Sequence, residues 1–103
     1  MKFKWVAGAA MLASSAVVMA QDQQALYLEG LAVTCAACHG IDGRVHAGPG
    51  VPALAGKPAQ ELVRQMRDFK SGTSPATVMQ QISKGYSDAQ IEQIARYFSS
   101  QTP

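Results

Sequence analysis

The residues with the clearest chemistry form the run Cys35-Ala36-Ala37-Cys38-His39. Two thiols at this spacing can each add to one of the two vinyl groups of a single haem. The histidine that follows directly is close enough to bind the iron of that haem as an axial ligand. The run therefore predicts one covalently attached haem c, anchored by Cys35 and Cys38 with His39 on the iron, and a protein that moves electrons.

Three other uses of a Cys-x-x-Cys pair stay open at this point. A thioredoxin-like dithiol site lies beside a strand–helix–strand pattern, and no such pattern is visible in the sequence. A structural zinc site needs four ligands, whereas the sequence beyond the run offers only His46 as a further histidine or cysteine. A disulfide between the two cysteines would close a small ring and stabilise the fold little. Covalent haem is the favoured interpretation.

An electron-transfer haem needs a second strong axial ligand, and the candidates are Met66, Met79 and His46. Met66 falls at the helical spacing of a core residue. His46 lies only seven residues after His39, which is too little chain to fold back across a haem. Met79 lies forty residues after His39, which is enough chain to reach the other face. The sequence favours Met79 as the ligand, with a purely packing role for it as the alternative.

The first twenty residues have the composition of a secretory signal peptide. Lys2 and Lys4 give a positive start, and residues 5–18 form an apolar run below the roughly 18 to 20 residues that span a bilayer. Small residues end the segment at Ala20, as signal peptidase requires. The sequence predicts a cleaved signal peptide over residues 1–20, export to the periplasm, and no stable membrane insertion of the mature protein.

The mature protein is expected to be a single small domain over residues 21–103. Without Lys2 and Lys4, seven of the nine basic residues remain, and they balance the seven acidic residues. A neutral chain gives no reason to expect binding to nucleic acid or to a membrane surface. Eighty-three residues bury only a marginal core, so the haem is expected to serve as a staple without which the chain folds poorly.

Apolar residues recur at helical spacing and no alternating strand pattern is present, so the fold class is predicted to be all-α. The region from Gly40 to Gly56 is rich in glycine and proline and is expected to be a loop. Capping residues, prolines and glycines mark the ends of the helices. The predicted helices run from about Asp22 to Val33, from Pro58 to Gly72, from Ser74-Pro75 to Lys84, and from the capping box Ser87-x-x-Gln90 onward.

The mature chain resembles the class I cytochrome c family over nearly all of its length. Besides the haem run, Val51-Pro52-Ala53-Leu54-Ala55-Gly56 is similar to the Pro-x-Leu that follows the haem motif in that family. The resemblance implies that the Pro52 carbonyl accepts a hydrogen bond from the outer ring nitrogen of His39, which fixes the orientation of that ligand. It also implies that Leu54 packs on the haem and that Met79 is the axial methionine.

The same resemblance implies a small fold of three to five helices wrapped around one covalently bound haem. The first and last helices would cross and bury a small residue, for which Gly30 is the candidate, against Tyr97 or Phe98. A half-exposed Tyr97 ring stays equally open.

A narrower resemblance connects the chain to the cytochrome subunit of flavocytochrome c sulfide dehydrogenases. It rests on Phe69-Lys70-Ser71-Gly72, Ala76-Thr77-Val78-Met79 and Ile82-Ser83-Lys84-Gly85-Tyr86-Ser87. It implies a haem subunit that accepts electrons from a flavoprotein (FAD) partner or another redox protein. The chain has no candidate nucleophile or general base, so it is expected to be an electron carrier and not an enzyme.

Two other functions stay open. One is a free soluble cytochrome c that shuttles electrons between respiratory or photosynthetic complexes. The other is a haem-based ligand-binding or sensing module with an open sixth position, in which Met79 is only a core residue.

Overall fold

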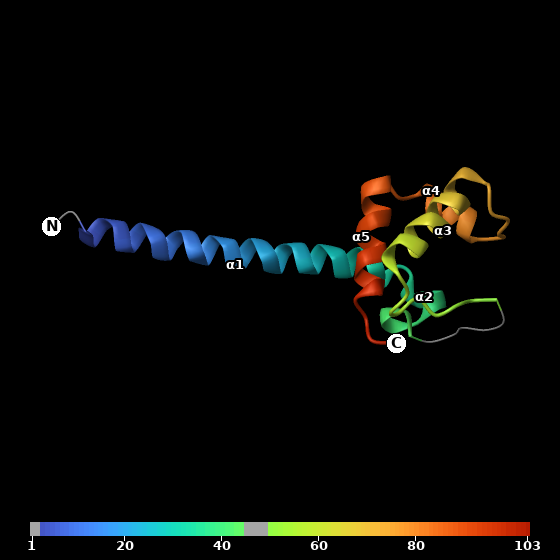
Figure 1. Ribbon diagram of the computed structural model, residues 1–103, viewed down its shortest axis with the longest axis horizontal. Coiled ribbons are helices and arrows are strands. Elements are labelled where there is room, and N and C mark those ends of the chain that lie inside the picture. Colours follow the sequence, from blue (N-terminus) through green and yellow to red (C-terminus); the bar gives the residue numbers. More distant parts are fainter. Residues whose placement is uncertain (1–2, 45–49) are drawn as a thin grey trace.

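The computed structural model describes residues 3–44 and 50–103, with side chains described from residue 16 onward. This part of the chain is helical and has no strand, which confirms the all-α class (Figure 1). The described ranges contain five α-helices, at the upper end of the expected three to five, together with one short 3-10 helix, η1. In chain order they are α1 (Phe3–Val33), α2 (Ala36–His39), η1 (Ile41–Gly43), α3 (Ala59–Ser71), α4 (Met79–Lys84) and α5 (Asp88–Ser99).

Helix α1 is much longer than the sequence pattern predicts. It begins at Phe3, so Asp22 lies inside the helix and does not cap it. The residues before Asp22 contain no proline and are mostly alanine and other residues compatible with a helix, so nothing in that stretch interrupts it. Residues 16–27 are all exposed, and the helix projects away from the other elements, which gives the molecule extents of 69 × 26 × 20 Å (Figure 1).

No helix in the described residues, α1 included, combines the length and the apolar character that a bilayer span requires.

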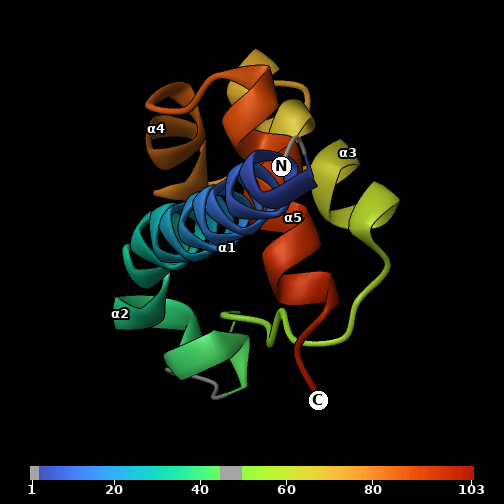
Figure 2. The ribbon, with the colours of Figure 1, turned by 90° about the vertical axis from the view of Figure 1, so that its left-hand side faces the viewer.

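The core lies where the end of α1, helix α3 and helix α5 meet. Figure 2 shows α1 lying across α5, with α3 on the other side of α5. One cluster of buried side chains fills this crossing: Ala32, Leu62, Ile94, Ala95 and Phe98. On α5 the buried residues Ile91, Ile94, Ala95 and Phe98 lie on one face of the helix, as the helical spacing of apolar residues in the sequence predicts.

Gly30 does not fill the helix crossing as expected. A side chain at Gly30 would meet no atom within 4 Å, whereas Ala32, two residues later, is only 4% exposed. The close approach belongs instead to Gly43, where an added Cβ would lie 2.8 Å from Leu54 Cβ and 2.9 Å from Phe98 Cδ1. Gly43 also has a φ of +74°, a conformation that glycine adopts at little cost.

Substitutions at these two glycines are expected to act in opposite directions. Gly43→Ala should lower the free energy of unfolding by about 2–4 kcal/mol, because it combines overpacking with a strained φ. Gly30→Ala should raise it by about 0.5–1 kcal/mol, because alanine is the better residue in an open helix interior. Chemical denaturation of the pigmented protein measures both values. Destabilisation by Gly30→Ala would contradict the observed packing.

The ends of helix α3 agree with the sequence prediction, whereas the start of helix α4 does not. Helix α3 begins after Pro58 and ends at Gly72, whose φ of +81° gives the left-handed cap expected there. Helix α4 begins only at Met79, not after Ser74-Pro75. The Ser74 amide donates back to the Asp68 carbonyl, and the Ser74 carbonyl accepts from the Gln80 side chain. These bonds hold the segment in a non-helical path that passes the end of α3.

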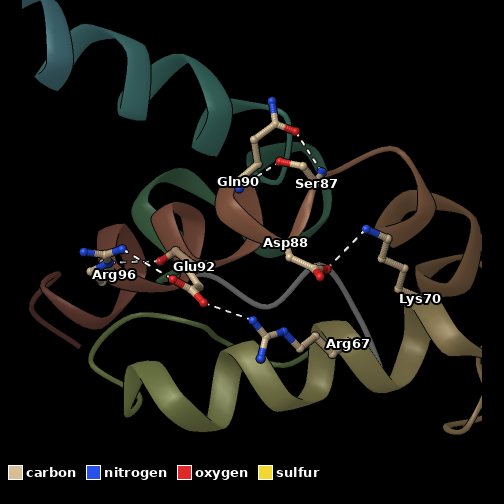
Figure 3. A network of polar contacts seen from close by, with 7 residues as sticks. All are labelled: Arg67, Lys70, Ser87, Asp88, Gln90, Glu92 and Arg96. Atoms are coloured by element: carbon tan, nitrogen blue, oxygen red, sulfur yellow. Dashed lines mark hydrogen bonds and ion pairs between the residues drawn. The ribbon is translucent and has the colours of Figure 1, made fainter.

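A polar network joins α3 to α5 across the surface (Figure 3). Arg67 contacts Glu92 at 3.0 Å, and Lys70 contacts Asp88 at 3.4 Å. Glu92 also pairs with Arg96 at 3.7 Å. At the start of α5 the predicted capping box is present, with the Ser87 side chain accepting from the Gln90 amide and the Gln90 side chain accepting from the Ser87 amide. Exposed ion pairs stabilise little, so this network mainly fixes how α5 lies against α3.

Candidate functional site

A cavity of about 720 Å³ opens between the haem-motif segment and helices α3, α4 and α5. Its volume lies in the range of pockets that hold a drug- or cofactor-sized ligand. Its walls are mostly apolar, with contributions from Leu62, Phe69, Ile82 and Ile94. All six predicted site residues line it: Cys35, Cys38, His39, Pro52, Leu54 and Met79.

The two thiols and His39 are brought together by a single helical turn. Cys35 precedes α2, and its carbonyl accepts hydrogen bonds from the amides of Cys38 at 3.3 Å and His39 at 2.9 Å. Both cysteines are free thiols, Cys35 half-buried and Cys38 exposed. The four-residue helix α2 was not foreseen, because so short a run has no measurable periodicity. Because of this turn, the side chains of both cysteines and of the histidine line the same cavity.

His39 is held by the hydrogen bond that the family resemblance implies. Its ring is buried, with 8% exposed, and Nδ1 lies 2.7 Å from the Pro52 carbonyl oxygen. A carbonyl can only accept, so Nδ1 carries the proton and donates it. In the neutral ring this bond leaves the lone pair on the other nitrogen, Nε2, and that is the tautomer of histidine that can bind a metal through Nε2.

The segment that carries Pro52 is itself fixed by backbone hydrogen bonds. The Gly43 carbonyl accepts from the amides of Leu54 at 2.8 Å and Ala55 at 3.2 Å, and the Phe98 carbonyl accepts from Gly56 at 3.0 Å. These bonds explain the close approach at Gly43. They place the Pro52 carbonyl within reach of His39 and turn Leu54, which is half-buried against the core, toward the cavity.

Two methionines from different helices reach the cavity. Met79, the first residue of α4, is half-buried and lines it, and so does Met66 from α3. The Met66 sulfur accepts a hydrogen bond of 3.5 Å from the Ser83 hydroxyl. His46 lies outside the described residues. The cavity thus offers two thioethers as the second axial ligand, of which the sequence favours Met79.

The competing interpretations of the cysteine pair gain no support. Burial raises the pKa of the Cys35 thiol, only partly offset by the hydrogen-bonding contact with Thr34, whereas redox-active dithiols need a lowered pKa. No three histidine, cysteine or carboxylate side chains gather as metal ligands in residues 3–44 and 50–103, while a structural zinc site uses four.

Tyr97 forms a contact that sequence reasoning missed. Its hydroxyl donates to Asp42 Oδ1 at 2.7 Å, and its ring packs edge-on against Phe98 with centroids 5.3 Å apart. Asp42 has a φ of +56°, so the turn after the haem motif is held in a strained conformation by this bond to α5. The ring is half-buried, which decides between the two alternatives left open for it.

The Asp42 carboxylate raises the pKa of Tyr97 from 10.0 to about 12, with burial adding to the effect. A pKa raised by folding stabilises the protein below the unfolded pKa, and that stabilisation is lost as the pH rises through the folded pKa. We expect the melting temperature to fall between pH 10 and 12 more steeply in the wild type than in Tyr97→Phe. If the melting temperatures of the two proteins fell equally over this pH range, the bond from Tyr97 to Asp42 would contribute nothing to stability.

The donors at this cavity fit haem c. Two free thiols can form the thioethers, a buried imidazole presents a bare Nε2, and a methionine thioether from α4 is available on a separate element. Apolar side chains supply the dry surroundings that such a cofactor needs. Nothing in the described lining conflicts with a bound porphyrin.

Comparisons with known proteins agree with this geometry. The cytochrome subunit of sulfide dehydrogenase from Chlorobaculum tepidum is 38% identical over 72 residues, which are 70% of this chain and 64% of that protein. The thiosulfate dehydrogenase electron acceptor from Stutzerimonas stutzeri is 37% identical over 94 residues, 87% of this chain and 44% of that protein. A solved cytochrome c4 from Acidithiobacillus ferrooxidans superposes with a TM-score of 0.60 at 38% identity, covering 64% of this chain and 38% of its own.

The chain thus spans less than two thirds of the length of each of these relatives. The family profile described as "Cytochrome c" matches residues 20–102, nearly all of the predicted mature chain. The resemblance drawn from the sequence is confirmed by this match, as is the class I fold by the solved structure. The chain belongs to the cytochrome c family, whose members transfer electrons through covalently attached haem c.

Proposed function

We propose that this protein is a periplasmic monohaem electron carrier in which Cys35 and Cys38 anchor the haem while His39 and Met79 bind its iron. When bound, the haem takes up and releases one electron at its iron. Pairing a thioether with a histidine raises the reduction potential relative to two histidines, so the carrier accepts electrons readily. Pro52 orients His39 through its carbonyl, and Leu54 packs against the porphyrin.

The arrangement around His39 is the observation that carries this proposal. The Pro52 carbonyl fixes Nδ1 as the donor, so the nitrogen with the free lone pair belongs to a buried ring that lines the same cavity as both free thiols. A histidine that served only the core would have no reason to share a cofactor-sized cavity with two cysteines. In this proposal Cys35, Cys38 and His39 are all used to hold the haem, so we assign the substrate chemistry to a partner.

Export to the periplasm is the second part of the proposal. Residues 1–20 have the three regions of a signal peptide. Residues 16–20 of α1, the part of this segment whose side chains are described, are exposed and contribute nothing to the core cluster, which is compatible with cleavage after Ala20. Amino-terminal sequencing of the exported protein is expected to begin at Gln21.

For the partner, we propose a flavoprotein that oxidises sulfide, with this chain as its haem subunit. The relative named as the cytochrome subunit of sulfide dehydrogenase supports this assignment. The second candidate is a free carrier for another donor, supported by the relative named as the electron acceptor of thiosulfate dehydrogenase. The two differ in whether a stable complex exists.

Purification from the native source tests the choice. A haem subunit should co-elute with a larger yellow flavoprotein, and sulfide should reduce its haem in that complex. A free carrier should elute alone, because transient electron-transfer encounters bury less than about 1,200 Å². Elution at its own small mass, with no reduction by sulfide in the whole extract, would refute the flavoprotein assignment.

A further inference from the structure

The cavity presents two chemically identical thioethers, and the structure distinguishes them. Met66 and Met79 both line it, from α3 and α4. A methionine sulfur binds iron through a lone pair, so the choice between the two must come from what surrounds each sulfur and not from the side chain itself.

Ser83 is the group that separates them. It is fully buried, with 0% exposed, and its hydroxyl donates to the Met66 sulfur at 3.5 Å. A thioether is a weak acceptor, and burying a hydroxyl with so weak a partner is unfavourable compared with an alanine that would pack in the same place. A packing role alone therefore does not account for a serine here.

Ser83 also connects the two methionines through helix α4. Met79 and Ser83 are four residues apart in α4, so they lie on the same face of that helix. The hydrogen bond to Met66 joins this face to α3. The same contact that engages the Met66 sulfur therefore holds α4 in the position from which Met79 reaches the cavity.

We propose that Ser83 selects the axial ligand: its hydroxyl engages the sulfur of Met66 and fixes α4 against α3, so that Met79 binds the iron. Ser83 is a positioning residue in this account, because it acts through the two methionines and does not touch the iron. The inference rests on the proposed function, which makes Met79 the ligand.

The experiment uses the reduced pigmented protein with ¹³C-methyl methionine, in which the methyl group of a bound methionine is displaced strongly upfield by the porphyrin ring current. The wild type should show one displaced methyl signal, and Met79→Ala should remove it with no replacement. In Ser83→Ala a second signal should appear with at least about a tenth of the total intensity. That signal should vanish in Ser83→Ala/Met66→Leu, which assigns it to Met66.

The double variant Ser83→Ala/Met79→Ala is the most demanding arm. Met66 is then free of the hydroxyl, and it should bind: a displaced methyl signal and the near-infrared iron–methionine band should both return relative to Met79→Ala alone. A serine that only stabilised the fold would lower the melting temperature without moving either spectrum.

Three results would overturn the inference. One is a single Met79 signal in Ser83→Ala together with no Met66 signal in Ser83→Ala/Met79→Ala. The second is binding of Met66 to the iron in Met79→Ala, where Ser83 is intact. This measurement tests the inference even if the Ser83 variants do not fold. The third is a wild-type protein whose displaced methyl signal comes from Met66, or that has no displaced methyl signal. Either result refutes the proposed ligand set itself, and the wild-type spectrum is recorded before any Ser83 variant is made.

Discussion

Met79→Ala is expected to abolish the near-infrared iron–methionine band of the oxidised protein and to lower its reduction potential. The expected drop is on the order of 0.1 V or more, within the roughly 0.8 V range that axial ligands span. Loss of the thioether leaves the sixth position open, so the reduced variant should also bind carbon monoxide rapidly. Redox titration followed by absorption, with carbon monoxide mixing, measures all three effects.

Met66→Leu is the matched control for Met79→Ala. It removes the competing thioether together with the bond to Ser83, so Met79 is the one methionine left in the described lining, and the band and the potential should stay nearly unchanged. The variant should lose about 1–3 kcal/mol of stability, because the buried Ser83 hydroxyl is left without its sulfur acceptor. The reverse pattern, with the band lost in Met66→Leu and kept in Met79→Ala, would make Met66 the ligand.

If the wild type and both variants all lack the iron–methionine band, the haem has no methionine ligand. Carbon monoxide that binds the wild type as fast as it binds Met79→Ala would then favour a ligand-binding or sensing module over an electron carrier.

Cys35→Ala/Cys38→Ala is expected to unfold the protein as well as to remove covalent attachment. The cavity occupies the space between α2, α3, α4 and α5. The described hydrophobic core beside it consists of only seven buried residues, five of them in the cluster where α1, α3 and α5 meet. Domains of this size bury a marginal fraction of their surface. Without the cofactor, the apolar lining of the cavity would be exposed to water.

Circular dichroism and thermal melting measure this prediction. The variant should have much less helix than the wild type and no cooperative transition. Met79→Ala, which keeps both thioether bonds, is the control and should stay folded. A cooperatively melting, unpigmented Cys35→Ala/Cys38→Ala protein would show that the chain does not need the cofactor to fold.

The sequence predicts the site more completely than it predicts the fold. Cys35, Cys38 and His39 are fixed by their spacing alone, and a short helical turn is enough to bring them together. The contact from His39 to Pro52 joins residues thirteen apart and followed only from the family resemblance, because no local pattern encodes which carbonyl a loop turns inward. Met79 could be favoured by chain length, but its sharing of the cavity with Met66 depends on how α3 and α4 pack.

The errors in the fold have physical causes. Asp22 has the chemistry of a cap, yet the residues before it can also form helix, so the cap is not used. Ser74-Pro75 is a good helix start, but bonds from Ser74 to Asp68 and Gln80 hold it outside α4. Gly30 and Gly43 are indistinguishable by residue type, and only the tertiary structure shows which of them another side chain approaches.

The central claim is that one haem is covalently bound to this chain between a histidine and a methionine. Intact mass of the exported native protein, with absorption spectra of its oxidised and reduced forms, tests it most directly. We predict the mass of residues 21–103 plus one haem that survives denaturation, and an iron–methionine band in the oxidised spectrum. A folded native protein with the mass of the polypeptide alone and no visible absorption would contradict the account.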